Sequence, residues 1–122
     1  MIKGTGTDII EISRIKEAVQ SSAGFVSRVF TPAEAEYCLN GKTKWGSLAV
    51  RFAAKEAAAK ALGTGIGRVR WTDIEIVNQE SGRPQINLRG AAAEEAERLG
   101  ISGLSLSVSH SREYAVAFVV AY

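Results

Sequence analysis

One stretch of the chain decides its fold: residues 51–67 read RFAAKEAAAKALGTGIG. Alanine, leucine, lysine and glutamate are strong helix formers, so this run predicts a long helix over about residues 47–62. Its many small side chains allow other backbones to approach closely, which indicates a central position in the fold. The glycines that follow residue 62 end the helix.

Shorter elements are predicted before this central helix. Residues 2–7 have the composition of a short strand. Helical spacing then begins at Ile9, and Asp8 and Glu11 stand at the N-cap and N3 positions of a capping box. A second helix start is predicted at residues 31–34, where threonine, proline and glutamate occupy the N-cap, N1 and N3 positions.

The part of the chain after the central helix is predicted to be mostly strand. Apolar patterns predict strands over residues 71–77, 85–87, 104–109 and 114–122 and a helix over residues 91–99. The last strand is apolar on both faces and therefore needs cover on both. Because helices and strands interleave without regular βαβ units, the predicted class is α+β.

Length and composition restrict the protein class. A chain of 122 residues is expected to form one domain over residues 1–122. The net charge of +2 is too small to indicate a nucleic-acid partner. The lone Cys38 excludes an intramolecular disulfide, and no signal-peptide core or run of eighteen apolar residues is present. We therefore expect a soluble, cytoplasmic protein that binds neither nucleic acid nor membranes.

Two acidic residues, Asp8 and Glu56, are candidates for chemistry. Asp8 either caps the predicted helix or binds a cation, and the two roles are compatible because a carboxylate has two oxygens. Glu56 either forms an exposed i,i+4 pair with Lys60 or lines a cleft, since on the helical wheel both share a face with small apolar residues and Phe52.

The glycine-rich loop at residues 63–67 also has two interpretations. Glycines that cradle a phosphate normally precede a helix, where free N–H groups face the anion, whereas these follow one. A glycine C-cap is the simpler interpretation. An anion bound nearby would then need a metal or cationic side chains. The candidate cations are Lys42, Lys44, Arg51 and Lys60.

His110 shares a predicted strand face with three aliphatic residues. It is either a buried core histidine or a ligand-contacting residue, because it stands at the strand end beside a turn. Other catalytic signatures are missing from the chain, including Cys/His pairs at zinc spacing, a nucleophile elbow and a Walker loop.

Three motifs taken together resemble one family. They are GTGTDIIEI at residues 4–12, RFAAKEAAAKALGTGIG at 51–67 and LSVSHS at 106–111. Their order and spacing are similar to those of the holo-acyl-carrier-protein synthases, the small trimeric branch of the 4′-phosphopantetheinyl transferases. WTDIEI at 71–76 and GRP at 82–84 extend the similarity over nearly the whole chain. It implies the 4′-phosphopantetheinyl transferase fold, an antiparallel-rich sheet packed with a long central helix and shorter helices.

The resemblance implies transfer of 4′-phosphopantetheine from coenzyme A to a serine of apo-acyl carrier protein, with release of adenosine 3′,5′-bisphosphate, in fatty acid biosynthesis. Asp8 and Glu56 would be the ligands of Mg²⁺, with Mn²⁺ as the alternative. This agrees with the preference of Mg²⁺ for one or two carboxylates completed by water and phosphate. Glu56, directly or through a water, is the candidate general base, and Lys60 would contact the phosphate chain.

The resemblance also assigns residues to the two substrates. The expected coenzyme A contacts are Lys42, Lys44, Arg51, Lys60, Gly63, Gly65, His110 and Ser111. Arg14 and Arg28 match the family's docking positions for an acidic carrier protein, and ordinary solvated arginines are the alternative. The family forms homotrimers with active sites between subunits, which would cover the two-sided apolar C-terminal strand.

Other function classes make different demands on the sequence. A non-catalytic module that binds coenzyme A or a nucleotide would keep the basic and glycine-rich elements but would not require both carboxylates. An RNA-binding protein would interleave aromatic with basic residues, and only Trp45 and Phe52 come close to that pattern. Ile10 occupies a position where larger two-domain transferases carry a further acidic residue, which favours the small trimeric subgroup.

Overall fold

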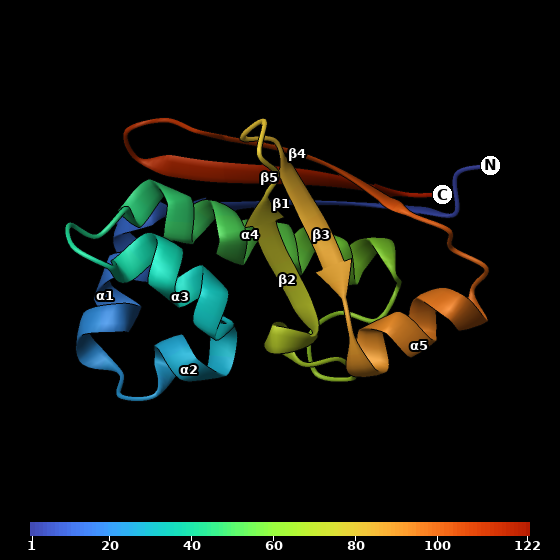
Figure 1. Ribbon diagram of the computed structural model, residues 1–122, viewed down its shortest axis with the longest axis horizontal. Coiled ribbons are helices and arrows are strands. Elements are labelled where there is room, and N and C mark those ends of the chain that lie inside the picture. Colours follow the sequence, from blue (N-terminus) through green and yellow to red (C-terminus); the bar gives the residue numbers. More distant parts are fainter.

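The computed structural model describes all 122 residues and contains two antiparallel sheets (Figure 1). The larger sheet has the strand order β1-β5-β4, and the smaller one is a hairpin of β2 and β3. The strands are β1 (Gly4–Glu11), β2 (Ile74–Asn78), β3 (Pro84–Leu88), β4 (Leu104–His110) and β5 (Tyr114–Ala121). The helices are α1 (Ile12–Ser21), α2 (Phe25–Val29), α3 (Pro32–Leu39), α4 (Trp45–Ala61), α5 (Gly90–Arg98) and the short 3-10 helix η1 (Trp71–Asp73). The predicted α+β class with an antiparallel-rich sheet is confirmed.

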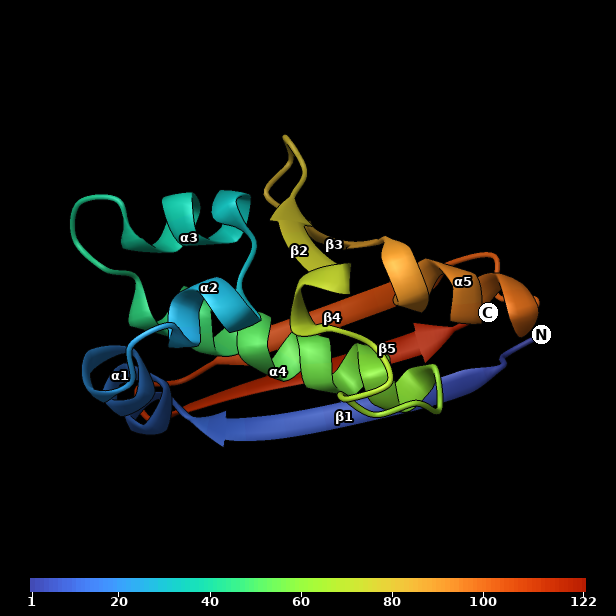
Figure 2. The same cartoon turned by 90° about the horizontal axis from the view of Figure 1, so that it is seen from below.

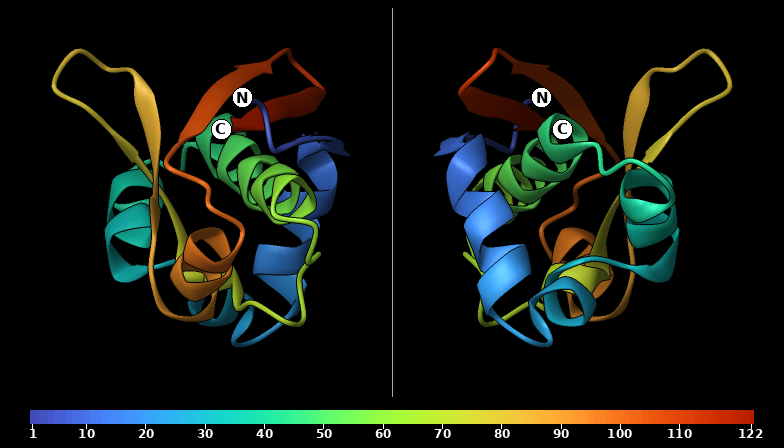
Figure 3. Two further views of the ribbon diagram at one scale, coloured as in Figure 1. Left: turned by 90° about the vertical axis from the view of Figure 1, so that its right-hand side faces the viewer. Right: turned by 90° about the vertical axis from the view of Figure 1, so that its left-hand side faces the viewer.

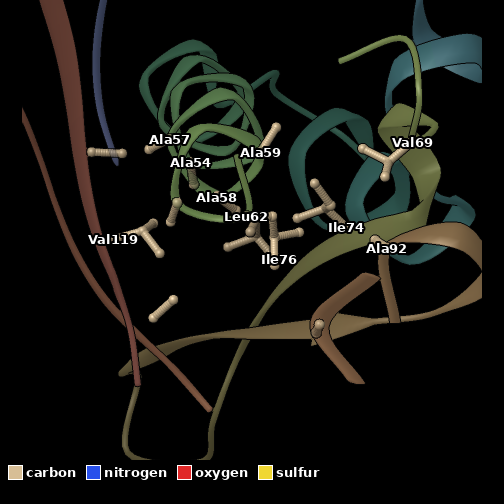
Figure 4. Close-up of a cluster of buried hydrophobic side chains, with 14 of the residues drawn as sticks. Ala54, Ala57, Ala58, Ala59, Leu62, Val69, Ile74, Ile76, Ala92 and Val119 are labelled. Atoms are coloured by element: carbon tan, nitrogen blue, oxygen red, sulfur yellow. The ribbon is translucent and has the colours of Figure 1, made fainter. Parts of the chain in front are cut away.

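Helix α4 is the centre of the fold, as its alanine-rich sequence predicts, and it lies along one face of the larger sheet (Figure 2). Figure 4 shows its alanines between Val119 of β5 and Ile76 of β2. Strand β1 approaches the helix very closely. A Cβ atom added to Gly6 would lie 1.9 Å from the carbonyl oxygen of Ala57, and one added to Gly4 would lie 2.2 Å from that of Ala61, one turn further along the helix. Only glycine permits this approach of two backbones.

The remaining elements surround α4 on the side away from the larger sheet (Figure 3). Helices α1, α2 and α3 lie at one end of the molecule, and α5 lies at the other, near both termini (Figure 1). Helix α3 begins where the sequence predicts, and its first residues form a capping box. The Thr31 hydroxyl accepts a hydrogen bond from the backbone N–H of Glu34, and the Glu34 carboxylate accepts one from the N–H of Thr31.

The N-terminal strand is longer than the sequence predicts. Strand β1 continues to Glu11, so Asp8 lies inside a strand, and the prediction that it caps a helix was wrong. Helix α1 begins at Ile12, and the Glu11 side chain makes no capping hydrogen bond. The physical reason is pairing with β5 along the whole of β1, which satisfies the backbone groups of residues 8–11 without a helix. Residues 71–73 likewise form η1, and the predicted strand begins only at Ile74.

The outer face of the larger sheet is uncovered in the single chain. Along β5, Ala115 and Ala117 point inward and are fully buried, whereas Tyr114, Val116 and Phe118 are exposed large hydrophobic side chains. Strand β5, which was predicted to need cover on both faces, is therefore covered on its inner face only. No helix of the structure has the length and hydrophobicity that crossing a membrane requires.

Candidate functional site

The close contact of β1 with α4 brings Asp8 and Glu56 into one cluster. Asp8 is half-buried on β1, and Glu56 is half-buried on the face of α4 that meets this strand. Lys60 bridges the two elements. Its ammonium group donates a hydrogen bond to the carbonyl oxygen of Thr7 at 2.9 Å, and its Nζ lies 3.5 Å from Oδ1 of Asp8. Glu56 makes no ion pair with Lys60, so the simple i,i+4 pair is not what the structure contains.

This cluster carries excess negative charge. Burial raises the pKa of Glu56, the neighbouring charge of Asp8 raises it further, and Lys60 lowers it only in part. Two carboxylates that repel each other in a partly buried place provide the oxygen ligands that a divalent cation prefers, and a cation would relieve their repulsion. The donor set of Asp8 and Glu56 therefore fits a hard metal ion such as Mg²⁺.

A second site lies near the N-terminal end of α4, where a pocket of about 170 Å³ opens between α4, β4 and the β2–β3 hairpin. Ser47, Arg51 and His110 line it together with residues of the hairpin. His110 is exposed at the end of β4, so the core-histidine interpretation was wrong. A Cβ atom added to Gly46 would lie 2.7 Å from Cε1 of the His110 ring, which means that the imidazole rests against the first turn of α4.

Arg51 is the unusual member of this pocket. Its side chain is only 4% exposed, yet its Nε has no hydrogen-bond partner and no carboxylate pairs with its guanidinium group. It donates one long hydrogen bond, of 3.4 Å, to the Ser47 carbonyl oxygen. A buried charged group without a counter-charge is costly unless a ligand supplies one. An anion in this pocket would supply the counter-charge that Arg51 does not find within the protein.

The other residues predicted to contact coenzyme A are spread around these two sites. Lys44 stands at the N-cap of α4 near Tyr37 of α3, whereas Lys42 lies exposed in the preceding loop without a partner. Gly63 and Gly65 have positive φ angles of 76° and 64°. Their N–H groups bond to carbonyl oxygens at the end of α4, which confirms the C-cap interpretation of this loop.

The predicted substrate-facing residues at the edges of the molecule are exposed. Ser111 follows His110 in the β4–β5 turn, and its hydroxyl accepts hydrogen bonds from backbone N–H groups of that turn. Arg14 lies on α1 and Arg28 on α2, and neither makes an ion pair. Arg28 lies 6.0 Å from the centre of the Phe25 ring. The two arginines thus belong to neighbouring helices at the same end of the molecule (Figure 1).

Sequence reasoning missed a buried ionic network on α4. Lys55 is fully buried, and its ammonium group pairs with the Glu34 carboxylate at 2.8 Å. It also donates hydrogen bonds to the carbonyl oxygens of Trp71 and Ile74, while the Glu34 carboxylate accepts a further bond from the N–H of Ile76. Burial lowers the pKa of Lys55, and Glu34 opposes that effect. The helical period places this lysine and Lys60 on different sides of α4, but it does not show which of them is buried, because alanines occur all around the helix.

Comparison with known proteins decides the family. The family model of the 4′-phosphopantetheinyl transferase superfamily matches residues 4–119. The chain belongs to this superfamily. It is 54% identical over 117 residues to a relative named holo-[acyl-carrier-protein] synthase from Chlamydia caviae, an alignment that covers 94% of this chain and 93% of the relative. The family resemblance recognised from the sequence motifs is therefore confirmed.

Solved structures of the superfamily have the same fold. The holo-[acyl-carrier-protein] synthase of Neisseria meningitidis superposes with a TM-score of 0.89 at 40% identity, covering 100% of this chain and 99% of that one. The enzyme of Helicobacter pylori, solved in complex with coenzyme A, superposes with a TM-score of 0.84 at 36% identity, covering 97% and 99%. The expected transferase fold is thus confirmed over essentially the full chain.

Proposed function

We propose that this phosphopantetheinyl transferase moves 4′-phosphopantetheine from coenzyme A to a serine of apo-acyl carrier protein, releasing adenosine 3′,5′-bisphosphate, as a step of fatty acid biosynthesis. The observation that carries the proposal is a pair of charged sites along α4 whose charges are not balanced within the protein. The two carboxylates of Asp8 and Glu56 have only the ammonium group of Lys60 beside them, and the buried guanidinium of Arg51 has no carboxylate partner. Coenzyme A in complex with a divalent metal supplies both partners.

The acidic cluster is the proposed reaction centre. Asp8 and Glu56 would hold Mg²⁺, or Mn²⁺ in its place, and Lys60 would contact the same phosphates from the rim of the cluster. A metal held there would neutralise charge on the diphosphate and orient it for attack. Asp8 is well suited to a fixed ligand position because its strand is paired on one edge and pressed against α4 by the glycine contacts.

The proposed step is displacement at the β-phosphorus of coenzyme A. The serine oxygen of the carrier protein forms a bond to this phosphorus, the bond to the bridging oxygen breaks, and adenosine 3′,5′-bisphosphate leaves with that oxygen. The serine proton must go to a base. Glu56 is our candidate, directly or through a water, because it lies beside Asp8 in the proposed reaction centre.

The cationic pocket is the proposed site for the nucleotide end of coenzyme A. Arg51 and His110 line it, Lys44 stands at its edge, and Lys42 and Ser111 flank it along the chain. The 3′-phosphate is the phosphate that would pair with Arg51, since it carries close to two negative charges and lies apart from the diphosphate. Gly63 and Gly65 would contact coenzyme A through van der Waals packing. Their N–H groups are not free to bind it, because they already donate hydrogen bonds to helix carbonyl oxygens.

Acyl carrier protein is the proposed protein partner, and Arg14 and Arg28 would dock its acidic surface. Both arginines are exposed, they lie on neighbouring helices, and neither pairs with a carboxylate. Arg14→Glu is expected to weaken carrier-protein binding while coenzyme A affinity stays unchanged. Lys3→Glu, which changes an exposed cation without an ion pair at the other end of the molecule, is the matched control. An equal loss of affinity for both substrates would show that Arg14 has a structural role instead.

We further propose a homotrimer with active sites between subunits. The exposed Tyr114, Val116 and Phe118 on the outer face of the larger sheet support it, because large contiguous apolar surfaces usually mark an interface. Size-exclusion chromatography with light scattering is expected to give three times the chain mass. Val116→Glu should shift the protein to smaller species, and a wild-type monomer would overturn this part of the proposal.

The test of the proposed function is the intact mass of a purified apo-acyl carrier protein after incubation with this protein, coenzyme A and Mg²⁺. The expected result is a gain of one phosphopantetheine, lost with EDTA and with Glu56→Gln. Arg98→Gln serves as an active control. If a folded wild-type protein modifies none of several carrier proteins yet binds coenzyme A, the non-catalytic binding module becomes the better assignment. Two further predictions remain: residues 1–122 form one domain, and the protein acts in the cytoplasm.

A further inference from the structure

Tyr37 contacts two cations that the proposed coenzyme A site uses. It belongs to α3, and the residue is 44% exposed. The guanidinium carbon of Arg51 lies 4.6 Å from the ring centre, and Nζ of Lys44 lies 5.0 Å from it. Both distances are within the range of cation–π attraction, which arises because the faces of an aromatic ring are negative.

The ring is the main compensation that the structure offers to Arg51. The guanidinium group is buried, its Nε has no partner, and its single hydrogen bond to Ser47 is long. A planar guanidinium stacks on an aromatic face without using its N–H groups, so they stay available for an anion in the pocket. Besides the ring, the only polar contact of the guanidinium group is the long hydrogen bond to the Ser47 carbonyl oxygen.

Lys44 makes two contacts with Tyr37. Besides its contact with the ring, its ammonium group donates a hydrogen bond of 3.1 Å to the backbone carbonyl oxygen of Tyr37. This carbonyl lies in the last turn of α3, where the negative end of the helix dipole favours a cation. Arg51 of α4 and Lys44 of the loop before it are thus gathered on one residue of α3.

We propose that Tyr37 is a positioning residue for substrate binding, holding Arg51 and Lys44 in the orientation that binds the 3′-phosphate of coenzyme A. The inference rests on the proposed function, because it takes coenzyme A as the ligand of this pocket. Tyr37 contributes through its ring and not through its hydroxyl group, which makes no hydrogen bond in the structure. It sets affinity for coenzyme A and leaves the chemical step to the acidic cluster.

The test compares Tyr37→Leu with Tyr37→Phe, using coenzyme A and 3′-dephospho-coenzyme A as paired ligands. Calorimetry on the full protein with Mg²⁺ gives the dissociation constants, and the carrier-protein mass assay gives KM and kcat. Tyr37→Leu is expected to raise the dissociation constant of coenzyme A roughly fivefold. It should raise KM similarly and leave kcat at saturating coenzyme A unchanged. Tyr37→Phe should restore the wild-type affinity.

Dephospho-coenzyme A separates positioning from a general effect on the fold. Its affinity should be the same in the wild type and in Tyr37→Leu, because the group that Arg51 and Lys44 bind is missing. In an Arg51→Met background, Tyr37→Leu should lose most of its effect on coenzyme A.

Three results would overturn the inference: no change in coenzyme A affinity in Tyr37→Leu, an equal loss for both ligands, or failure of Tyr37→Phe to restore binding. A wild-type protein that transfers no phosphopantetheine would instead count against the proposed function, so the two failures are distinguishable.

Discussion

Two buried cations of α4, Lys55 and Arg51, stand four residues apart and therefore on one side of the helix, yet their surroundings differ sharply. Lys55 is surrounded by acceptors, which are the Glu34 carboxylate and two backbone carbonyl oxygens. Arg51 has one long hydrogen bond, an unpartnered Nε and the face of an aromatic ring. The protein provides acceptors for the whole ammonium group of Lys55, whereas the guanidinium group of Arg51 can bind an additional partner.

This difference separates a structural charge from a binding charge. A buried ion with a complete set of partners holds the elements that supply them, here α3 and β2 against α4. A buried ion with an incomplete set lowers the stability of the free protein and is stabilised when a ligand of opposite charge arrives. The carboxylates of Asp8 and Glu56 follow the second pattern, with the sign of charge reversed.

The largest effect is expected from Lys55→Met. Removing the ammonium group leaves the Glu34 carboxylate buried without its cation and two carbonyl oxygens without their donor. We expect the free energy of unfolding to fall by about 3–5 kcal/mol, the cost of breaking a buried ion pair from one side. Urea denaturation followed by circular dichroism measures it. A fall below about 1 kcal/mol would mean that the Lys55–Glu34 pair does not hold the fold.

Arg51→Met, the matched change at the other buried cation, should behave in the opposite way. Its free energy of unfolding should change by less than about 1 kcal/mol, because few protein contacts of the charge are lost. The dissociation constant of coenzyme A should rise roughly tenfold to a hundredfold, as expected for a lost charged hydrogen bond. Calorimetric titration and urea denaturation of the same sample check both halves. Large destabilisation with unaltered affinity would remove the distinction between the two cations.

The smallest effect concerns the titration of Glu56, which can be followed by NMR in metal-free protein. Because the charge of Asp8 raises the pKa of Glu56 and Lys60 lowers it, Asp8→Asn should shift the pKa of Glu56 down, and Lys60→Met should shift it up. Glu94, exposed on α5, is the internal control residue. Shifts of the opposite sign, or none, would show that the three side chains do not form one cluster.

The same raised pKa makes a prediction about pH. A glutamate whose pKa is higher in the folded state contributes stability that is fully present below its ordinary pKa and is lost as the pH rises through the folded value. Metal binding requires the ionised carboxylate, so Mg²⁺ affinity should rise over that pH range. Titration of Mg²⁺ at a series of pH values measures this dependence, and it should flatten in Glu56→Gln.

Periodic and local signals were sufficient for much of this protein. The alanine-rich helix over residues 45–61, the capping box at Thr31 and Glu34, and the alternating strand β4 are encoded within short windows of sequence. Such features depend on backbone propensity and on nearest neighbours along the chain, so they can be predicted without knowledge of the fold. The motifs around Asp8, Glu56 and His110 were also sufficient to recognise the family.

Only the tertiary structure decided the environment of each charged residue. The sequence placed Asp8 at a helix N-cap, but pairing of β1 with β5 drew it into a strand, because a long ladder of backbone hydrogen bonds outweighs one local cap. Likewise, the sequence does not show which lysine of α4 is buried: the side chain of Lys55 is 0% exposed, whereas that of Lys60 is 51% exposed. Burial and partners come from the elements packed around α4, and these are distant in sequence. Sequence therefore indicated which charges the protein has, and packing determined which of them are satisfied and which are left for a ligand.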